Sequence, residues 1–387
     1  MKDNLHVKAS NHPCGTLTRE GKEFIFNYTT EEKSSFISLT MPVRVKSYIN
    51  DKLHPIFEMN LPEGYLLSII KKHFSKIEKI DDFALLKLMA QSINARVTYT
   101  LNTKEKQMPL SLGNLLHPQS ANLFSELVER FALSSPLSGV QPKVLAQVSN
   151  KATLSLEEYI VKSWGNEYPQ LALNEYFCMS ALKYANLTVP EFYISDDYKL
   201  FIMKRFDSKD DGSYLGFEDM CVLQAKNAED KYEGSYERIA KSIKIFVSPK
   251  HKKNSLLSFF KMIVLNTLLQ NGDAHLKNFG LIYDSIEDIK LAPAYDVVCT
   301  TLYIKNDIPA LHLLGSKKWW GKKYLLRFGV ESCDLSQHEA KQSYDECVSA
   351  IFQVNQEIQS KITNEPSLEI QEFLSELQKK FQIDEEI

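Results

Sequence analysis

The segment QNGDAHLKNFGLIYDSIEDIKLAPAYD, residues 270–296, decides the fold. It follows the run SLLSFFKMIVLNTLLQ (255–270), whose apolar residues cover nearly every side and predict a buried helix. We expect this helix to end at Asn271-Gly272, with Gly272 in the left-handed conformation that often closes a helix. The strand-like runs FGLIYD and DIKLAPAYD follow, and they predict a hairpin that ends at Asp296.

Three polar residues of this segment have a spacing that suits phosphoryl transfer. Asp273 and Asn278 are five residues apart, the D-x-x-x-x-N interval of the protein-kinase catalytic loop, and Asp296 follows 18 residues later across the hairpin. Such chemistry needs an Asp that accepts the proton of a hydroxyl, and an Asn and a second Asp that bind Mg²⁺. Each residue alone is consistent with a cap, a turn or a loop. Together they predict a catalytic site, with His275 as a further candidate that is equally consistent with a structural histidine.

A kinase site also requires a lysine that binds phosphates, and the strand-like run EEYIVKSW (157–164) ends its apolar alternation at Lys162. The next predicted helix carries Glu175 in LALNEYF, an acidic partner for that ammonium. The strand KLFIMKRFD (199–207) is expected to contact adenine at about Met203 to Phe206. The alternative is an exposed lysine at a strand end and a solvated helix acid.

The phosphate-binding loop is predicted in SSPLSGVQPK (134–143), which directly precedes the first strand of this region and contains Gly139, Gln141 and Lys143. A surface turn is the simpler interpretation of its composition. The segment GSKKWWGKK (315–323) differs from the Walker A pattern by one residue of spacing and by its lack of a final Ser or Thr.

The rest of the chain predicts an α+β, two-lobed, kinase-like architecture. Residues 1–122 form an N-terminal subdomain, with a small antiparallel sheet predicted over GTLTRE, KEFIFNYTT and SSFISLTM (34–41) and helices over residues 61–74 and 81–93. Residues 123–215 form a β-rich small lobe that carries the loop and the lysine, and residues 216–387 form a helical large lobe.

Composition and charge narrow the function further. With 387 residues and 44% hydrophobic residues the chain is globular, and its net charge of −3 supplies no broad attraction for nucleic acid. The six cysteines never reach C-x-x-C spacing, as expected for reduced, buried thiols. There is no apolar targeting segment near the N-terminus and no candidate membrane span, so we expect a cytoplasmic protein.

These residues resemble the HipA-like serine/threonine kinase toxins of bacterial toxin–antitoxin systems. SGVQPK is similar to the family's Gly-rich loop, YIVK to its ATP-lysine strand, and FEDMC (217–221) to a signature between its lobes. GDAHLKNFG and LAPAYD resemble its catalytic loop and metal aspartate. The runs CGTL, FIFNY, SLTMP and NLPEG follow the order of its N-terminal subdomain, so the resemblance covers nearly the whole chain.

The resemblance implies a role for each candidate residue. Asp273 is the implied catalytic base, Asn278 and Asp296 are Mg²⁺ ligands, Lys162 binds the ATP phosphates and His275 lies beside the transferring group. It also implies phosphorylation of a cytoplasmic, translation-related protein, with an aminoacyl-tRNA synthetase as the substrate class. The implied partner is a small helix-turn-helix antitoxin of the HipB type, through which any DNA contact is made.

Autophosphorylation is the one implied property where this sequence departs from the family pattern. Family members phosphorylate a serine of the Gly-rich loop, usually three residues before its glycine, and that position is Pro136 here. Ser138 stands immediately before Gly139 and is the predicted autophosphorylation site.

Two other functions remain open at this point. A pseudokinase could hold nucleotide and antitoxin as a transcriptional co-repressor, although the joint presence of Asp273, Asn278, Asp296 and Lys162 argues against lost chemistry. A metal-dependent phosphohydrolase could use Asp273, His275 and Asp296, but the sequence lacks a convincing second set of metal ligands.

Overall fold

The chain forms two compact units, which are described separately below. The computed structural model describes residues 3–64, 67–68, 81–90, 92–100, 110–120, 122–131, 143–150 and 155–382. The first unit comprises Met1–Ser163, Ser195–Asp230 and Ile282–Glu287. The second unit comprises Trp164–Ile194, Lys231–Leu281 and Asp288–Ile387.

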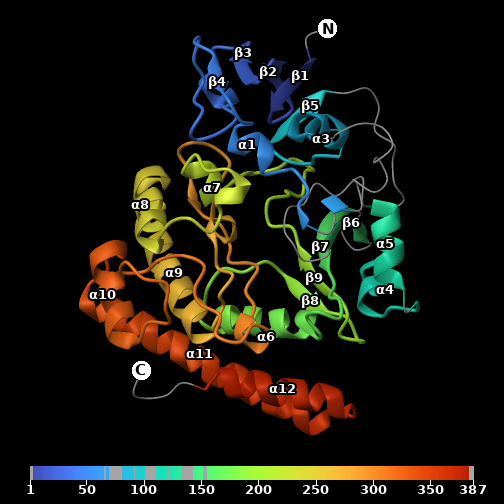
Figure 1. Cartoon of the computed structure of the whole chain (residues 1–387), viewed down its shortest axis with the longest axis vertical. Helices are drawn as coiled ribbons and strands as arrows, with labels where there is room; N and C mark the ends of the chain where they lie inside the picture. The colour runs from blue at the N-terminus through green and yellow to red at the C-terminus, as the bar shows by residue number, and fades with distance from the viewer. Residues whose placement is uncertain are drawn as a thin grey trace. The chain divides into compact units, whose positions relative to one another are not determined.

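The first unit begins with an antiparallel sheet in the order β4-β3-β2-β1-β5 (Figure 1). Its strands are β1 (Asp3–Ala9), β2 (His12–Glu20), β3 (Glu23–Tyr28), β4 (Tyr48–Asn50) and β5 (Val97–Thr100). Ala9 pairs with His12, so Ser10 and Asn11 form a two-residue turn, and both have positive φ (48° and 68°). This geometry matches the right-handed twist of hairpin strands. The predicted sheet over GTLTRE and KEFIFNYTT is confirmed.

The predicted strand over residues 34–41 is wrong. Lys33–Ser35 is a 3₁₀ helix (η1), and the segment, all of which the structure describes, contributes only an isolated bridge between Ser38 and Met41. The cause is tertiary, because Glu218 accepts hydrogen bonds from the Ser38 hydroxyl (2.7 Å) and the Leu39 N–H (2.8 Å). The Leu39 N–H, which is engaged in this way, cannot also pair with a neighbouring strand.

The short helices of this region are α1 (Pro55–Glu58) and α3 (Asp82–Met89). α3 confirms the helix predicted over residues 81–93, and it begins where the Asp81 carboxylate accepts a hydrogen bond from the Ala84 N–H (2.9 Å). Most of the helix predicted over residues 61–74 lies outside the described residues.

A second antiparallel group of strands in the first unit runs in the order β6-β7-β9. These strands are β6 (Lys143–Asn150), β7 (Ser155–Lys162) and β9 (Phe201–Lys204), where the sequence predicted strands. α4 (Leu112–Leu116) and α5 (Leu123–Phe131) contact β6. β10 (Gly216–Asp219), α7 (Met220–Leu223) and the 3₁₀ helix η3 (Ala228–Asp230) complete the unit.

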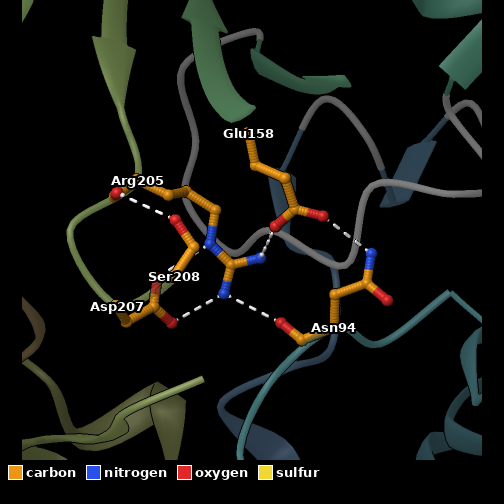
Figure 2. A network of polar contacts seen from close by, with 5 residues as sticks. All are labelled: Asn94, Glu158, Arg205, Asp207 and Ser208. Atoms are coloured by element: carbon orange, nitrogen blue, oxygen red, sulfur yellow. Dashed lines mark hydrogen bonds and ion pairs between the residues drawn. The ribbon is translucent and has the colours of Figure 1, made fainter. Parts of the chain in front are cut away.

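A buried polar network follows β9 (Figure 2). The Arg205 guanidinium donates to both oxygens of Asp207 (2.8 and 2.6 Å), to Glu158 (2.7 Å) and to the Asn94 carbonyl (2.8 Å). The Asn94 amide in turn donates to the other oxygen of Glu158 (2.9 Å), and the Ser208 hydroxyl donates to the Arg205 carbonyl (3.3 Å). The network therefore fixes the segment after β9 to β7 and to the N-terminal region.

The second unit is built from helices (Figure 1). They are α6 (Leu171–Tyr184), α8 (Tyr236–Phe246), α9 (Pro249–Leu268), α10 (Lys322–Cys333), α11 (Gln337–Asn364) and α12 (Leu368–Lys380), and a short strand β8 (Phe192–Ile194) follows α6. α11 contacts α6, α9, α10 and α12. α9 is buried as predicted, and Phe259, Phe260 and Val264 of this helix have no exposed surface.

Short elements follow α9 and carry the segment that decided the fold. They are the 3₁₀ helix η4 (Leu276–Asn278), β11 (Gly280–Tyr283), β12 (Lys290–Leu291) and the 3₁₀ helix η5 (Thr300–Leu302). β11 and β12 are hydrogen-bonded neighbours, as the predicted hairpin requires, although β12 is only two residues long.

Two expectations about the environment of the side chains can be compared with the structure. All six cysteines are free and buried, as predicted. Among the helices in the described part of the chain, none combines the length and the apolar character that crossing a membrane requires.

Candidate active site

The loop after α9 is held by hydrogen bonds that begin within the helix. The Asn271 amide donates to the Asn266 side chain (2.7 Å), and the Asn271 side-chain oxygen accepts the Asp273 N–H (3.1 Å). Gln270, with φ of 53°, takes the left-handed conformation that was predicted for Gly272. The helix therefore closes two residues earlier than expected.

Gly272 is needed for a different reason, which is close packing. A Cβ atom at this position would lie 2.0 Å from a carboxylate oxygen of Asp307 and 2.9 Å from the Ile308 carbonyl oxygen. Its N–H donates to the Thr300 hydroxyl (2.8 Å), and that hydroxyl donates to Asp307. The start of the loop after α9 is thereby fixed to η5 and the segment after it.

Asp273 is open to solvent and carries a perturbed carboxyl group. The protein around it raises its pKa, chiefly by partial desolvation, and the nearby carboxylates of Asp296 and Asp307 act in the same direction. The Tyr232 hydroxyl donates to Asp273 (2.7 Å) and lowers the pKa, as does the ammonium of Lys231. Asp273 is thus an accessible proton acceptor whose charge is tuned by two residues from another segment.

Asn278 and Asp296 meet across the hairpin, as the spacing predicted. The Asn278 side-chain oxygen accepts the His275 N–H (3.0 Å), and its NH₂ group donates to an Asp296 oxygen (2.9 Å). Asp296 has a φ of 61°, in the left-handed region that Asp and Asn tolerate better than most residues. The Tyr295 hydroxyl donates to the Lys277 carbonyl (2.6 Å) and ties the two sides together.

The donor set fits Mg²⁺. Carboxylate and amide oxygens are its preferred protein ligands, and Mg²⁺ commonly takes one or two of them together with substrate phosphates. Each oxygen of Asn278 and Asp296 that already accepts a hydrogen bond has a second lone pair. The part of the chain that the structure describes contains no group of three or more His, Cys, Asp or Glu residues that could hold a metal ion.

His275 is buried beside these residues and is neutral at physiological pH. Burial lowers its pKa to about 3, and the Lys231 ammonium adds to this effect, whereas Asp296 opposes it. The ring lies edge-on to Tyr232, with centroids 5.1 Å apart. His275 therefore offers a neutral imidazole to the site rather than a cation.

Lys231 and Tyr232 were not predicted from the sequence. The Lys231 carbonyl accepts the Leu276 N–H (3.0 Å), and the Tyr236 hydroxyl donates to the Ala274 carbonyl (3.1 Å), so the start of α8 and the segment before it are joined to the loop after α9. The contact between Tyr232 and Asp273 spans 41 residues of sequence. No motif in KYEGSYERIA signals it.

The predicted small-lobe residues lie in the first unit. Lys162, at the end of β7, is 2% exposed, and it pairs in register with Lys143 on β6 and with Phe201 on β9. Met203 is buried on β9, and Phe206 packs edge-on against Phe217 with centroids 5.4 Å apart. The strand placement of these residues is the predicted one, and their roles stay predictions.

The remaining predicted residues have different outcomes. Gly139, Gln141 and Ser138 lie outside the described residues. Glu175 lies fully buried on α6 of the second unit, whereas Lys162 belongs to the first unit, so their ion pair stays a prediction.

Comparisons with known proteins agree on one family. The family model for a HipA-like C-terminal domain matches residues 135–355, and the model for a HipA N-terminal domain matches residues 5–100. A protein of Sinorhizobium fredii named "Putative kinase Y4dM" is 27% identical over 350 residues, which are 81% of this chain and 81% of that protein. A Haemophilus influenzae protein named "Putative kinase" is 33% identical over 207 residues, 47% of this chain and 58% of that protein.

A solved structure has a similar fold. It is the complex of HipA, HipB and operator DNA from the toxin–antitoxin system of Shewanella oneidensis MR-1. The alignment has a TM-score of 0.73 with 19% sequence identity, and it covers 97% of this chain and 95% of the matched chain. The α+β, kinase-like fold class predicted from the sequence is confirmed.

Proposed function

The chain belongs to the HipA family, and from that premise we propose that it is an ATP- and Mg²⁺-dependent protein serine/threonine kinase and the toxin of a toxin–antitoxin module. The observation that carries the proposal is the arrangement of Asp273, Asn278 and Asp296 in one loop cluster. A solvent-open carboxylate lies beside an amide–carboxylate pair with the oxygen donors that Mg²⁺ prefers. The relatives named as kinases support the same activity.

In this proposal Asp273 accepts the proton of the substrate hydroxyl while the hydroxyl oxygen attacks the γ-phosphorus of ATP. The bond between that phosphorus and the bridging oxygen of ADP breaks, and ADP leaves. Asn278 and Asp296 would hold Mg²⁺, which would supply positive charge to offset the negative charge of the nucleotide phosphates. The neutral His275 ring packs against Tyr232 and keeps the proton-accepting side of the site in place.

The first unit supplies the nucleotide contacts in this proposal. Lys162, oriented by Glu175, binds the ATP phosphates, and the chain at about Met203 to Phe206 contacts adenine. The loop with Gly139, Gln141 and Lys143 covers the phosphates, and Ser138 in that loop is the site of autophosphorylation. A phosphate there would add about −1.5 to −2 charges beside the nucleotide and hinder its binding.

The proposed partners follow from the family. The protein substrate is a cytoplasmic, translation-related protein, with an aminoacyl-tRNA synthetase as the class we expect. The neutralising partner is a HipB-like, helix-turn-helix antitoxin, since the solved structure of similar fold contains HipB and operator DNA. With a net charge of −3 the chain itself has no broad attraction for DNA, so contact with DNA is expected through the antitoxin.

The decisive test is incubation of the full chain with labelled ATP, Mg²⁺ and a cell lysate, followed by phosphosite mapping. We expect labelled serine or threonine in one major lysate protein and a phosphate on Ser138. The matched control is Asp273→Ala, which removes contaminating kinases as an explanation. Equal labelling by the wild type and this variant would contradict the proposal.

A further inference from the structure

The segment GSKKWWGKKY, residues 315–324, is the strongest unassigned feature near the catalytic loop. It contains four lysines, three aromatic residues and no acid. Lys318 and Lys323 are exposed, and the structure gives neither one an acidic partner in the part of the chain that it describes. We call this stretch the basic–aromatic segment.

Two sets of contacts place the basic–aromatic segment beside Asp273. The Lys317 ammonium donates to the Tyr232 carbonyl (3.1 Å), and the Tyr232 hydroxyl donates to Asp273 (2.7 Å). Lys318 and the two following tryptophans line a small cavity together with Asn271, whose side chain holds the Asp273 backbone. The basic–aromatic segment and the loop that carries Asp273 therefore share contacts with Tyr232 and Asn271 within the second unit.

The aromatic residues act as a rigid support for the lysines. The Trp319 indole N–H donates to the Asp307 carbonyl (3.0 Å), and the Trp320 indole N–H donates to the Leu313 carbonyl (2.8 Å). The Lys318 ammonium lies 3.9 Å from the centre of the Trp320 ring, and the Tyr324 ring centroid is 4.5 Å from it. Nucleobases need open aromatic faces for stacking, and here those of Trp320 are in use.

We infer that the basic–aromatic segment is the docking surface for an acidic stretch of the protein substrate, which lies next to the serine or threonine that reaches Asp273. The inference rests on the proposed kinase function and adds the charge class of the substrate. An acidic stretch complements the lysines, while locked aromatic side chains disfavour single-stranded RNA as the occupant. Charge complementarity of this kind selects the partner and speeds its encounter, and reversing the charge of the lysines places like charges against the acidic stretch.

The test measures binding separately from catalysis. A fluorescein-labelled peptide rich in Asp and Glu with one central serine is titrated with the full chain at about 50 mM salt, where exposed charges are weakly screened. Lys318→Glu/Lys323→Glu should weaken binding at least about tenfold. The matched control Lys241→Glu/Lys341→Glu, which reverses two exposed lysines elsewhere in the second unit, should bind like the wild type. Circular dichroism checks that all variants fold.

Each outcome has a definite meaning. Equal binding of the acidic peptide by Lys318→Glu/Lys323→Glu and the wild type overturns the docking surface. Labelled oligouridylate is the second probe. The docking surface is also overturned if the wild type binds oligouridylate but not the acidic peptide, and Lys318→Glu/Lys323→Glu loses the oligouridylate binding. If Asp273→Ala still binds the peptide but no variant transfers phosphate to it or to any other acceptor, the docking surface stands and the kinase function fails. If Lys318→Glu/Lys323→Glu transfers less phosphate to the acidic peptide because its KM for the peptide is raised, the docking surface and the kinase function both stand.

Discussion

The network around Arg205 and the cluster around Asp273 use the same kinds of side chain with different results. In the first unit Arg205 makes four hydrogen bonds, and its side chain and that of Glu158 are 11% and 5% exposed. Although burial opposes it, the carboxylates of Asp207 and Glu158 raise the pKa of Arg205 and keep it charged. In the second unit partial burial raises the pKa of Asp273, and two nearby carboxylates act in the same direction.

The difference separates a structural network from a candidate reactive site. Buried charges that satisfy one another stabilise a particular arrangement of the chain, and removal of one partner is costly. A cluster with excess negative charge and a solvent-open carboxylate gains its counter-charge from a ligand instead. Changes in the first region should therefore alter stability, and changes in the second should alter activity.

The largest effect is expected for Asp273→Ala and for Asp296→Asn, which avoids placing an alanine at a φ of 61°. If the proposed roles hold, loss of the proposed metal ligand or of the proposed proton acceptor should reduce phosphate transfer by about 100-fold to 10,000-fold. The urea midpoint should stay equal to that of the wild type or rise, because like charges are removed. Transfer of labelled phosphate measures activity, and urea unfolding measures stability. A variant with a lower urea midpoint than the wild type would contradict the comparison.

The second largest effect is expected for Arg205→Met. It leaves Glu158 and Asp207 buried without their cation, so the free energy of unfolding should fall by about 3–5 kcal/mol. Lys204→Met is the matched control, since that neighbouring lysine is 30% exposed and pairs with Glu157, and its loss should cost less than about 1 kcal/mol. Equal losses for the two variants would show that the Arg205 network has no special weight.

A smaller loss is expected for Asn94→Ala. The substitution removes the hydrogen bond from the Asn94 side-chain amide to Glu158. It keeps the Asn94 backbone carbonyl, which accepts a hydrogen bond from Arg205. We expect the free energy of unfolding to fall by about 1.5 kcal/mol, as for one hydrogen bond to a charged group. Phosphate transfer should be unchanged, and a clear loss of transfer at full stability would place this network in the active site.

The smallest effect is expected for Tyr232→Phe and sharpens the comparison through pH. The Tyr232 hydroxyl lowers the pKa of Asp273, so its removal raises that pKa further. Asp273 must be ionised to accept a proton, and the acid limb of the kcat/KM profile should therefore move to higher pH, with little loss above it. An acid limb that stays in place would show that another group controls it.

The sequence predicted the parts of the site that local spacing controls. The interval between Asp273 and Asn278 and the hairpin that returns Asp296 depend on one short segment, and their geometry followed. Lys231 and Tyr232 were missed because tertiary folding alone brings them to the loop. Gln270, and not Gly272, takes the helix-closing conformation, and Gly272 is instead required for the close packing against Asp307.

Tertiary contacts that local spacing does not reveal also explain the wrong strand prediction in the first unit. The alternation in SSFISLTM predicts a strand, but Ser38 and Leu39 bind Glu218, which lies 180 and 179 residues away in sequence. Glu218 also accepts a hydrogen bond from the Tyr283 hydroxyl (2.5 Å). A periodicity argument sees only neighbours along the chain, so it cannot weigh a carboxylate that arrives from so far away.

The left-handed backbone of Asp296 has a practical consequence for making this protein in quantity. Among neutral residues with a side chain, Asn tolerates this conformation most readily, and it has almost the same shape as Asp. Asp296→Asn is therefore the substitution that silences the site with the least disturbance to the backbone. A cell should therefore tolerate expression of this variant. The purified variant could then serve as bait to capture and identify the substrate.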